Sequence, residues 1–165
     1  MNNRIVLILL LITFIPAGVS CSKTKLPDGM PQLYPCTVKI IQEGKPLAEA
    51  EILLKSADPN LERWAITGRT DANGTARIVT MGKYSGAPLG DYTVLLSKNE
   101  TIYDQPPKEV HGEMVYGPST SYFLISPDQG NEDKSPHKLT IESKTNQYEF
   151  DCGKKVRIKC PKETM

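Results

Sequence analysis

Residues 36–55, CTVKIIQEGKPLAEAEILLK, decide the fold class of this chain. Cys36, Val38 and Ile40 occupy every second position, and this period of two is typical of a β-strand with one buried face. The polar stretch 43–46 then predicts a turn, and 50–55 predicts a second strand. The whole stretch therefore indicates β structure and not a helix.

The same pattern continues along the chain, with turn residues between short apolar runs at intervals of roughly 8–15 residues. Further strands are expected at 63–68, 75–80, 91–97, 139–142, 147–151 and 156–160. Together the runs predict an all-β sandwich of about seven strands over residues 34–160.

The stretch 99–136 interrupts this pattern with five prolines and three glycines. It predicts a long crossover loop, because a segment of this length without clear strands is either functional or mobile. Its aromatic residues include Tyr103, Tyr116 and Tyr122, and we expect them to pack the crossover onto the sandwich. The alternative is that these three tyrosines form a ligand-contact surface.

The N-terminal stretch 5–15, IVLILLLITFI, is an apolar run of eleven residues behind Arg4. At ~1.5 Å per residue, a helix of this length covers about half of a ~30 Å bilayer core. The run therefore predicts a signal peptide over 1–20 and not a membrane span. The following stretch 21–33 is polar, with proline and glycine, and predicts a tether.

The leader ends in AGVSC at 17–21, which resembles the lipobox of bacterial lipoproteins. The resemblance implies cleavage before Cys21 and a lipid (diacylglyceryl, with palmitate-type chains) on its thiol. Two or more acyl chains anchor a protein durably. The protein is then expected on a bacterial membrane of the cell envelope, facing the periplasm or the exterior. The alternative is an ordinary secretory leader.

Three further motifs occur in order over residues 34–97: GKPLAEAEI at 44–52, TDANG at 70–74 and LGDYTV at 89–94. They resemble the turns and strands of transthyretin-like modules, also called carboxypeptidase regulatory-like domains. Residues 122–127 and 135–150 are similar to the closing strands of planctomycete-type lipoproteins built on this module. The resemblance implies a transthyretin-like or immunoglobulin-like β-sandwich but no activity, because such folds host many uses.

If Cys21 carries lipid, Cys36, Cys152 and Cys160 remain, which allows one disulfide in an oxidising compartment. Were the first and last strands antiparallel neighbours, Val38 would face Ile158 and the two outer cysteines would face each other. We therefore predict a Cys36–Cys160 disulfide. The pairs Cys36–Cys152 and Cys152–Cys160 remain as alternatives.

Composition argues against several functions. The chain holds 20 Lys and Arg against 19 Asp and Glu, so it lacks the basic surplus that nucleic-acid binding needs. A hydrolase needs a nucleophile, a base and an orienting group, whereas His111 and His137 lie in loop-like sequence. Glu109 and Glu113 are interpreted as loop charges. We expect no catalytic residue, no metal site and no cofactor.

The sequence thus predicts a non-catalytic, lipid-anchored extracytoplasmic module with a structural, assembly or ligand-docking role. Its membrane contact is the lipid on Cys21, and its protein or glycan partner is not specified by the sequence. The first alternative is a carbohydrate- or peptide-binding domain that uses Tyr103, Tyr116 and Tyr122. The second is a small extracytoplasmic hydrolase.

Overall fold

The computed structural model describes residues 25–161, so the expected signal peptide over 1–20 and Cys21 lie outside the described residues. The described chain is all-β, with two single-turn 3-10 helices, η1 (Pro59–Leu61) and η2 (Pro127–Gly130). Its strands are β1 (Leu33–Tyr34), β2 (Cys36–Gln42), β3 (Lys45–Pro46), β4 (Glu51–Ser56), β5 (Ile66–Arg69), β6 (Thr75–Arg77), β7 (Val79–Thr80), β8 (Tyr84–Ser85), β9 (Ala87–Pro88), β10 (Gly90–Ser97), β11 (Asn99–Tyr103), β12 (Lys108–Val110), β13 (Glu113–Val115), β14 (Ser119–Phe123), β15 (Lys138–Ile141), β16 (Asn146–Asp151) and β17 (Ile158–Lys159).

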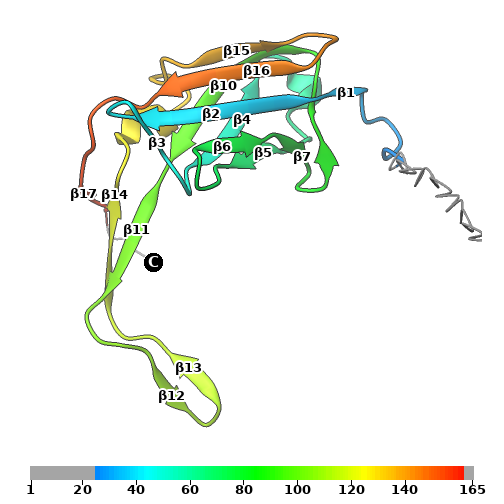
Figure 1. The fold of residues 1–165 in the computed structure, drawn as a ribbon. Helices are drawn as coiled ribbons and strands as arrows, with labels where there is room; N and C mark the ends of the chain where they lie inside the picture. The colour runs from blue at the N-terminus through cyan, green and yellow to red at the C-terminus, as the bar shows by residue number, and fades with distance from the viewer. Residues whose placement is uncertain (1–24, 162–165) are drawn as a thin grey trace, which may run out of the picture.

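Two sheets pack face to face as a β-sandwich, which confirms the predicted fold class (Figure 1). One sheet has six strands in the order β15-β10-β4-β5-β7-β8. The other has the order β16-β2-β3, with β6 also paired to β2. Its β16–β2 pair is parallel, whereas the other strand pairs are antiparallel.

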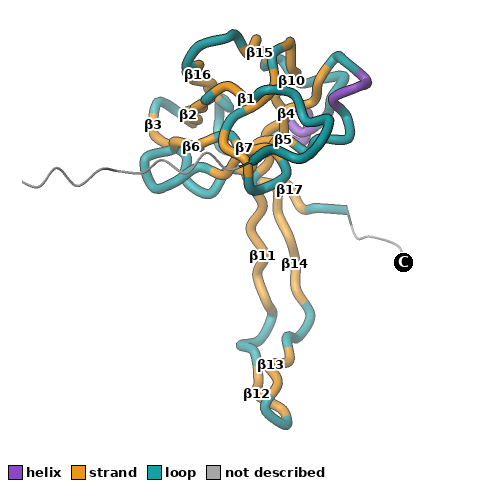
Figure 2. The backbone as a smooth tube through the Cα atoms, turned by 90° about the vertical axis from the view of Figure 1, so that its right-hand side faces the viewer, coloured by secondary structure: helices purple, strands orange, loops and turns teal. Residues whose placement is uncertain are grey.

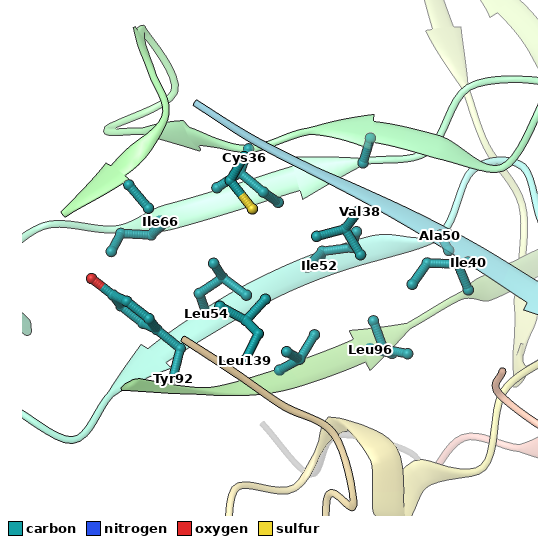
Figure 3. Packing of buried hydrophobic residues seen from close by; sticks show 14 of the residues in the cluster. Cys36, Val38, Ile40, Ala50, Ile52, Leu54, Ile66, Tyr92, Leu96 and Leu139 are labelled. Carbon is teal, nitrogen blue, oxygen red and sulfur yellow. The ribbon is translucent and has the colours of Figure 1, made fainter. Parts of the chain in front are cut away.

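The core lies between the sheets and follows the predicted alternation (Figure 3). Val38 and Ile40 point inward from β2 and are fully buried. Ile52 and Leu54 meet them from β4, where the neighbouring positions 51 and 53 are exposed. Burying such side chains stabilises the fold by about 1.5–3 kcal/mol each. The alternating pattern therefore has a direct energetic cause.

The turn at 70–74 connects β5 of the six-stranded sheet to β6 of the other sheet. The Asp71 carboxylate accepts hydrogen bonds from the backbone N–H groups of Asn73 and Thr75, both at 2.9 Å. The buried Thr70 hydroxyl accepts a bond from the N–H of Ala50 at 2.8 Å. Gly74 has a φ of +72°, as a glycine in a tight turn permits.

The predicted strand 75–80 is two strands in different sheets. β6 pairs with β2, and β7 pairs with β5. Between them the N–H of Ile78 donates to the carbonyl of Cys36 at 3.0 Å, and the Ile78 side chain is fully buried. The chain thus changes sheet at this residue, which a continuous alternating pattern does not reveal.

The expected closing strands 139–142 and 147–151 are present but do not pair with each other. β15 pairs with β10 in the six-stranded sheet, whereas β16 pairs in parallel with β2 in the opposite sheet. The chain crosses from one sheet to the other between them. Asn146 lies at this crossing and is buried.

The positions of the cysteines contradict the predicted Cys36–Cys160 disulfide. β17 pairs with β14 and not with β2, so Cys160 does not face Cys36. Cys36, Cys152 and Cys160 are all free in the structure, and the predicted Cys36–Cys160 disulfide is not formed. Cys36 and Cys152 lie at opposite ends of the β2–β16 pair, since Cys36 faces Asn146 and the N–H of Cys152 binds Ile41. Burial raises the pKa of each of these two thiols to about 11.

Tyr92 has a structural role inside the sandwich. Its ring is buried between the sheets, and its hydroxyl donates to the carbonyl of Pro88 at 2.9 Å. Burial, with a smaller effect of Asp58, raises the pKa of the Tyr92 phenol to about 12.

Candidate functional site

Much of the expected crossover loop is a folded β-hairpin that projects from the sandwich (Figure 2). We call residues 99–123 the arm. Its inner half pairs β11 with β14 from Asn99 opposite Phe123 to Tyr103 opposite Ser119. Its outer half, which we call the tip, pairs β12 with β13. The prediction of an unstructured crossover is therefore wrong for this part of 99–136.

Local sequence explains the shape of the arm. Pro106 and Pro107 lack backbone N–H groups and interrupt the ladder between the two halves. At the far end His111 and Gly112 have φ values of 53° and 84°. Two central residues with positive φ are typical of a type I′ turn, which joins two antiparallel strands tightly. The His111-Gly112 pair, followed by the apolar run 114–116, is the signal that would have predicted this hairpin.

The arm exposes large apolar side chains that a sandwich strand would bury. These are Ile102, Tyr103, Val110, Met114, Val115 and Tyr116, each more than 40% exposed. All residues of β12 and β13 are exposed. The registers place these side chains on both faces of the hairpin, and such a concentration of exposed apolar residues in one segment is typical of an interaction site. The arm is therefore the candidate functional site.

The structure separates the three candidate contact tyrosines. Tyr103 and Tyr116 lie together on the arm, with ring centroids 5.0 Å apart, and both rings are exposed. The expectation that they pack onto the sandwich is wrong. Tyr122 lies at the arm's root, half-buried, with the guanidinium of Arg157 4.5 Å from its ring centroid. Tyr122 therefore packs against the C-terminal segment, next to β17.

The arm's root is braced by the C-terminal segment. β17 pairs with β14, and Arg157 forms an ion pair with Glu100 at 3.4 Å. The N–H of Cys160 donates to the carbonyl of Ser121 at 2.9 Å. β17 and Cys160 thus contact β14 on the side opposite β11, whereas the ion pair of Arg157 joins the C-terminal segment to β11.

Charge along the arm is strongly one-sided. It carries four carboxylates, Glu100, Asp104, Glu109 and Glu113, against the single cation Lys108. Glu109 is opposite Met114 and Glu113 is opposite Val110, so the two tip glutamates point to opposite faces of the hairpin. They do not form a carboxylate pair, in agreement with their interpretation as surface charges.

The two histidines lie in different parts of the molecule. His111 is exposed at the end of the arm. His137 is half-buried, with Nε2 3.2 Å from the Gln129 side-chain oxygen and its ring against Phe150. Burial lowers the pKa of His137, and the nearby Asp151 opposes this shift. Residues 25–161 contain no cluster of three or more His, Cys, Asp or Glu that could hold a metal ion.

A shallow groove of about 580 Å³ on the outer face of the six-stranded sheet is the second candidate site. Its floor follows one cross-strand row, in which Leu95 faces Leu53, Leu53 faces Thr67 and Thr67 faces Val79. Arg69 and Arg77 also line it. This groove was not expected from the strand pattern of the sequence. The signal was present in the doublets Leu53-Leu54 and Leu95-Leu96, because one leucine of each adjacent pair in a strand must face outward.

Comparisons with known proteins add no family. No protein-family profile and no curated protein matches the chain. Among solved structures, a 9R-lipoxygenase from Cyanothece is similar over 81% of this chain and 18% of its own, at 18% identity and a TM-score of 0.31. The chain thus spans less than a fifth of that enzyme. A TM-score this low carries no inference about fold or activity. No helix among the described residues is long and apolar enough to cross a membrane.

Proposed function

We propose that this protein is a non-catalytic, lipid-anchored module of a bacterial cell envelope that docks a partner through its projecting arm. The single observation that carries the proposal is the arm itself. It holds six of the ten large apolar side chains found exposed in the described chain. These exposed apolar side chains do not stabilise the sandwich, so their exposure is explained better by binding to a partner.

The place of the arm supports a docking role away from the membrane. β1 pairs with β9, just before β10 begins, and the arm follows the opposite end of β10. In Figure 1 the arm leaves the sandwich at the end remote from β1. An anchor on Cys21 would hold the β1 end near the lipid, and the arm would then leave from the membrane-distal end.

The sandwich serves as a rigid base in this proposal, with the transthyretin-like module as its suggested family. The motifs at 44–52, 70–74 and 89–94 support this assignment by their order and spacing. The non-catalytic assignment rests on the separation of His111 from His137 and on the opposite orientation of the tip glutamates. A second candidate, glycan binding, is favoured by the exposed pair of rings of Tyr103 and Tyr116.

Lipidation of Cys21 is testable by metabolic labelling. Cells that express the full chain are expected to incorporate labelled palmitate into it, whereas Cys21→Ala is expected to remove the label and release the protein from the membrane fraction. Cys160→Ala is the matched control and is expected to retain the label. Undiminished labelling of Cys21→Ala would exclude this cysteine as the lipid site.

Docking by the arm is testable by photo-crosslinking in native membranes. A photoactivatable benzophenone side chain at position 115 of the full chain is expected to give one discrete adduct, because Val115 is exposed at the tip. The same group at position 45, on the exposed strand β3, is the control and should give none. Equal adducts at both positions, or none at position 115, would refute docking. Soluble glycan that competes for the adduct would favour the second candidate.

A companion variant tests whether the arm is independent of the fold. Residues 104–118 are replaced by Asn-Gly, which links the directly opposed Tyr103 and Ser119 by a two-residue turn. The melting temperature is expected to stay almost unchanged, since residues 104–118 are exposed. Loss of the crosslinked partner with an intact fold would then be assigned to the arm alone.

A further inference from the structure

We propose that the partner of the arm is a second copy of this chain, and that the tip of each arm docks in the groove beside Arg69 and Arg77 of the other copy. This inference rests on the proposed docking function and names its partner. It follows from the complementary charge and apolar surface of these two regions, and from the position of the groove at the root of the arm.

The groove is apolar along its floor and basic along its border. Leu53 is 38% exposed although it lies in the middle of a sheet, where it packs beside Leu95. Arg69 forms an exposed ion pair with Glu49, and Arg77 makes no ion pair with any residue in 25–161. Glu51 is the acidic residue of the lining. The groove therefore suits a ligand that is both apolar and negatively charged.

The tip has this composition. Met114 and Glu109 are directly opposite each other on one face of the hairpin, and Glu113 lies beside the end turn. Met is a flexible side chain that fills irregular apolar surfaces well. With Met114 over Leu53, Glu109 on the same face would lie near Arg69 and Arg77, whereas Glu113 leaves the opposite face of the hairpin and adds negative charge beside the end turn. Carboxylate–guanidinium hydrogen bonds are among the strong ones in proteins.

The position of the groove allows each copy to dock its tip in the groove of the other copy. Ser97 lines the groove and is two residues from Asn99, where the arm begins. Two arms that lie antiparallel therefore bring each tip to the root of the other arm. The arm has the reach, because twelve residues of extended chain span up to ~40 Å. Reciprocal docking gives a closed two-fold dimer, the commonest form of homo-oligomer.

Charge also selects this occupant over a membrane surface. Four carboxylates against one lysine make the arm acidic, whereas bacterial-type anionic lipid attracts basic segments. The rest of the described chain carries more basic than acidic side chains. The acidic arm is therefore attracted electrostatically to the sandwich of a second copy of this chain, and it is repelled by an anionic bilayer.

A charge-swap experiment tests the proposal with the full chain in detergent micelles. The arm variant combines Glu109→Lys with Glu113→Lys, and the groove variant combines Arg69→Glu with Arg77→Glu. Wild-type chains are expected to form dimers by sedimentation equilibrium. Each variant alone should dimerise at least ~10-fold more weakly, because like charges then meet in both docking sites. An equal mixture should recover dimers, since both sites of the mixed dimer pair opposite charges.

Recovery in the mixture is decisive because two misfolded variants could not complement each other. The control pair is Lys45→Glu and Lys144→Glu, exposed charge reversals outside the groove, which should leave the dimer unchanged. Failure of the mixture to recover dimers overturns the inference. A monomeric wild type that still gives an adduct with a different protein at position 115 also overturns it, while the docking function stands. Absence of both dimer and adduct overturns both.

Discussion

Replacing Gly74 by alanine is expected to destabilise the sandwich by about 4 kcal/mol, at the upper end of single-site effects. Gly74 has a φ of +72°, which costs an L-residue about 1–2 kcal/mol. In addition, a Cβ at this position would lie 2.6 Å from the carbonyl oxygen of Ile40 and 2.9 Å from the backbone nitrogen of Leu47. Both atoms belong to backbone, so no side-chain rotation relieves the overlap.

The overlap cannot be relieved without breaking hydrogen bonds. The N–H of Ile40 donates to the carbonyl of Gly74 at 2.8 Å, and the N–H of Leu47 donates to the carbonyl of Ile40 at 2.9 Å. Moving the turn away from β2 would lengthen the first bond, and moving the chain at Leu47 would lengthen the second. Because this is the point where the 70–74 turn contacts β2, the damage should reach the whole sandwich.

The matched control is Gly44→Ala. Gly44 has nearly the same φ, +75°, but a Cβ there meets no atom within 4 Å. Its cost should be only the conformational one, about 1–2 kcal/mol. Urea unfolding of the two variants, followed by circular dichroism, measures the difference. Equal losses at the two positions would show that close approach at Gly74 does not matter.

The turns and the core could be predicted from the sequence because both depend on local chemistry. Asp71 and Gly74 define their turn by their own side-chain and backbone preferences. The alternation of Val38 and Ile40 reports which face of a strand is buried, whatever the neighbouring strand. Such signals need no knowledge of the partner strand.

Which strands are neighbours could not be predicted, because these local signals carry no information about the partner strand. Val156, Ile158 and Cys160 alternate correctly for a strand, yet β17 covers the root of the arm and not β2. The parallel pairing of β16 with β2 requires a crossing between sheets, and a period of two does not encode it. The predicted disulfide relied on this missing information.

The arm was not predicted because its strands lack the buried apolar face that the strands of the sandwich have. Its apolar residues, such as Val110 and Val115, face solvent, so periodicity finds no buried face. Sequences are locally inconsistent with folding rules where function requires it. The groove likewise depends on Leu53, an outward leucine in a strand whose other outward positions are polar or charged. Both exceptions lie where we place the docking surfaces.

Asn146→Asp is expected to cost about 4 kcal/mol at pH 7, although the two side chains have nearly the same shape. Asn146 is 2% exposed. Its amide nitrogen donates to the carbonyls of Lys144 at 2.8 Å, Glu142 at 3.1 Å and Pro35 at 3.3 Å. Its amide oxygen accepts from the N–H of Glu142 at 3.1 Å. A carboxylate would keep the last bond and place a negative charge against three carbonyl oxygens.

The loss should depend on pH in a defined direction. Burial beside three carbonyls raises the pKa of the introduced carboxyl above its ordinary value of about 3.9, because both effects disfavour the charged form. The folded state then holds its proton to higher pH than the unfolded state does. Stability relative to wild type should therefore be best below about pH 4 and fall as pH rises through the folded-state pKa. At pH 4 the protonated carboxyl donates one hydrogen bond, and about half of the loss should be recovered.

Asn99→Asp makes the same chemical change at an exposed position at the root of the arm, where the Asn99 side chain forms no hydrogen bond with residues 25–161. It should change stability by less than about 0.5 kcal/mol at either pH. Urea unfolding at pH 7 and pH 4 compares the two variants. A loss at Asn146 that stays constant with pH would mean that the amide nitrogen is not the group facing the carbonyls. A loss that shrinks in acid would show that this one amide holds the chain where it crosses from β15 to the parallel strand β16.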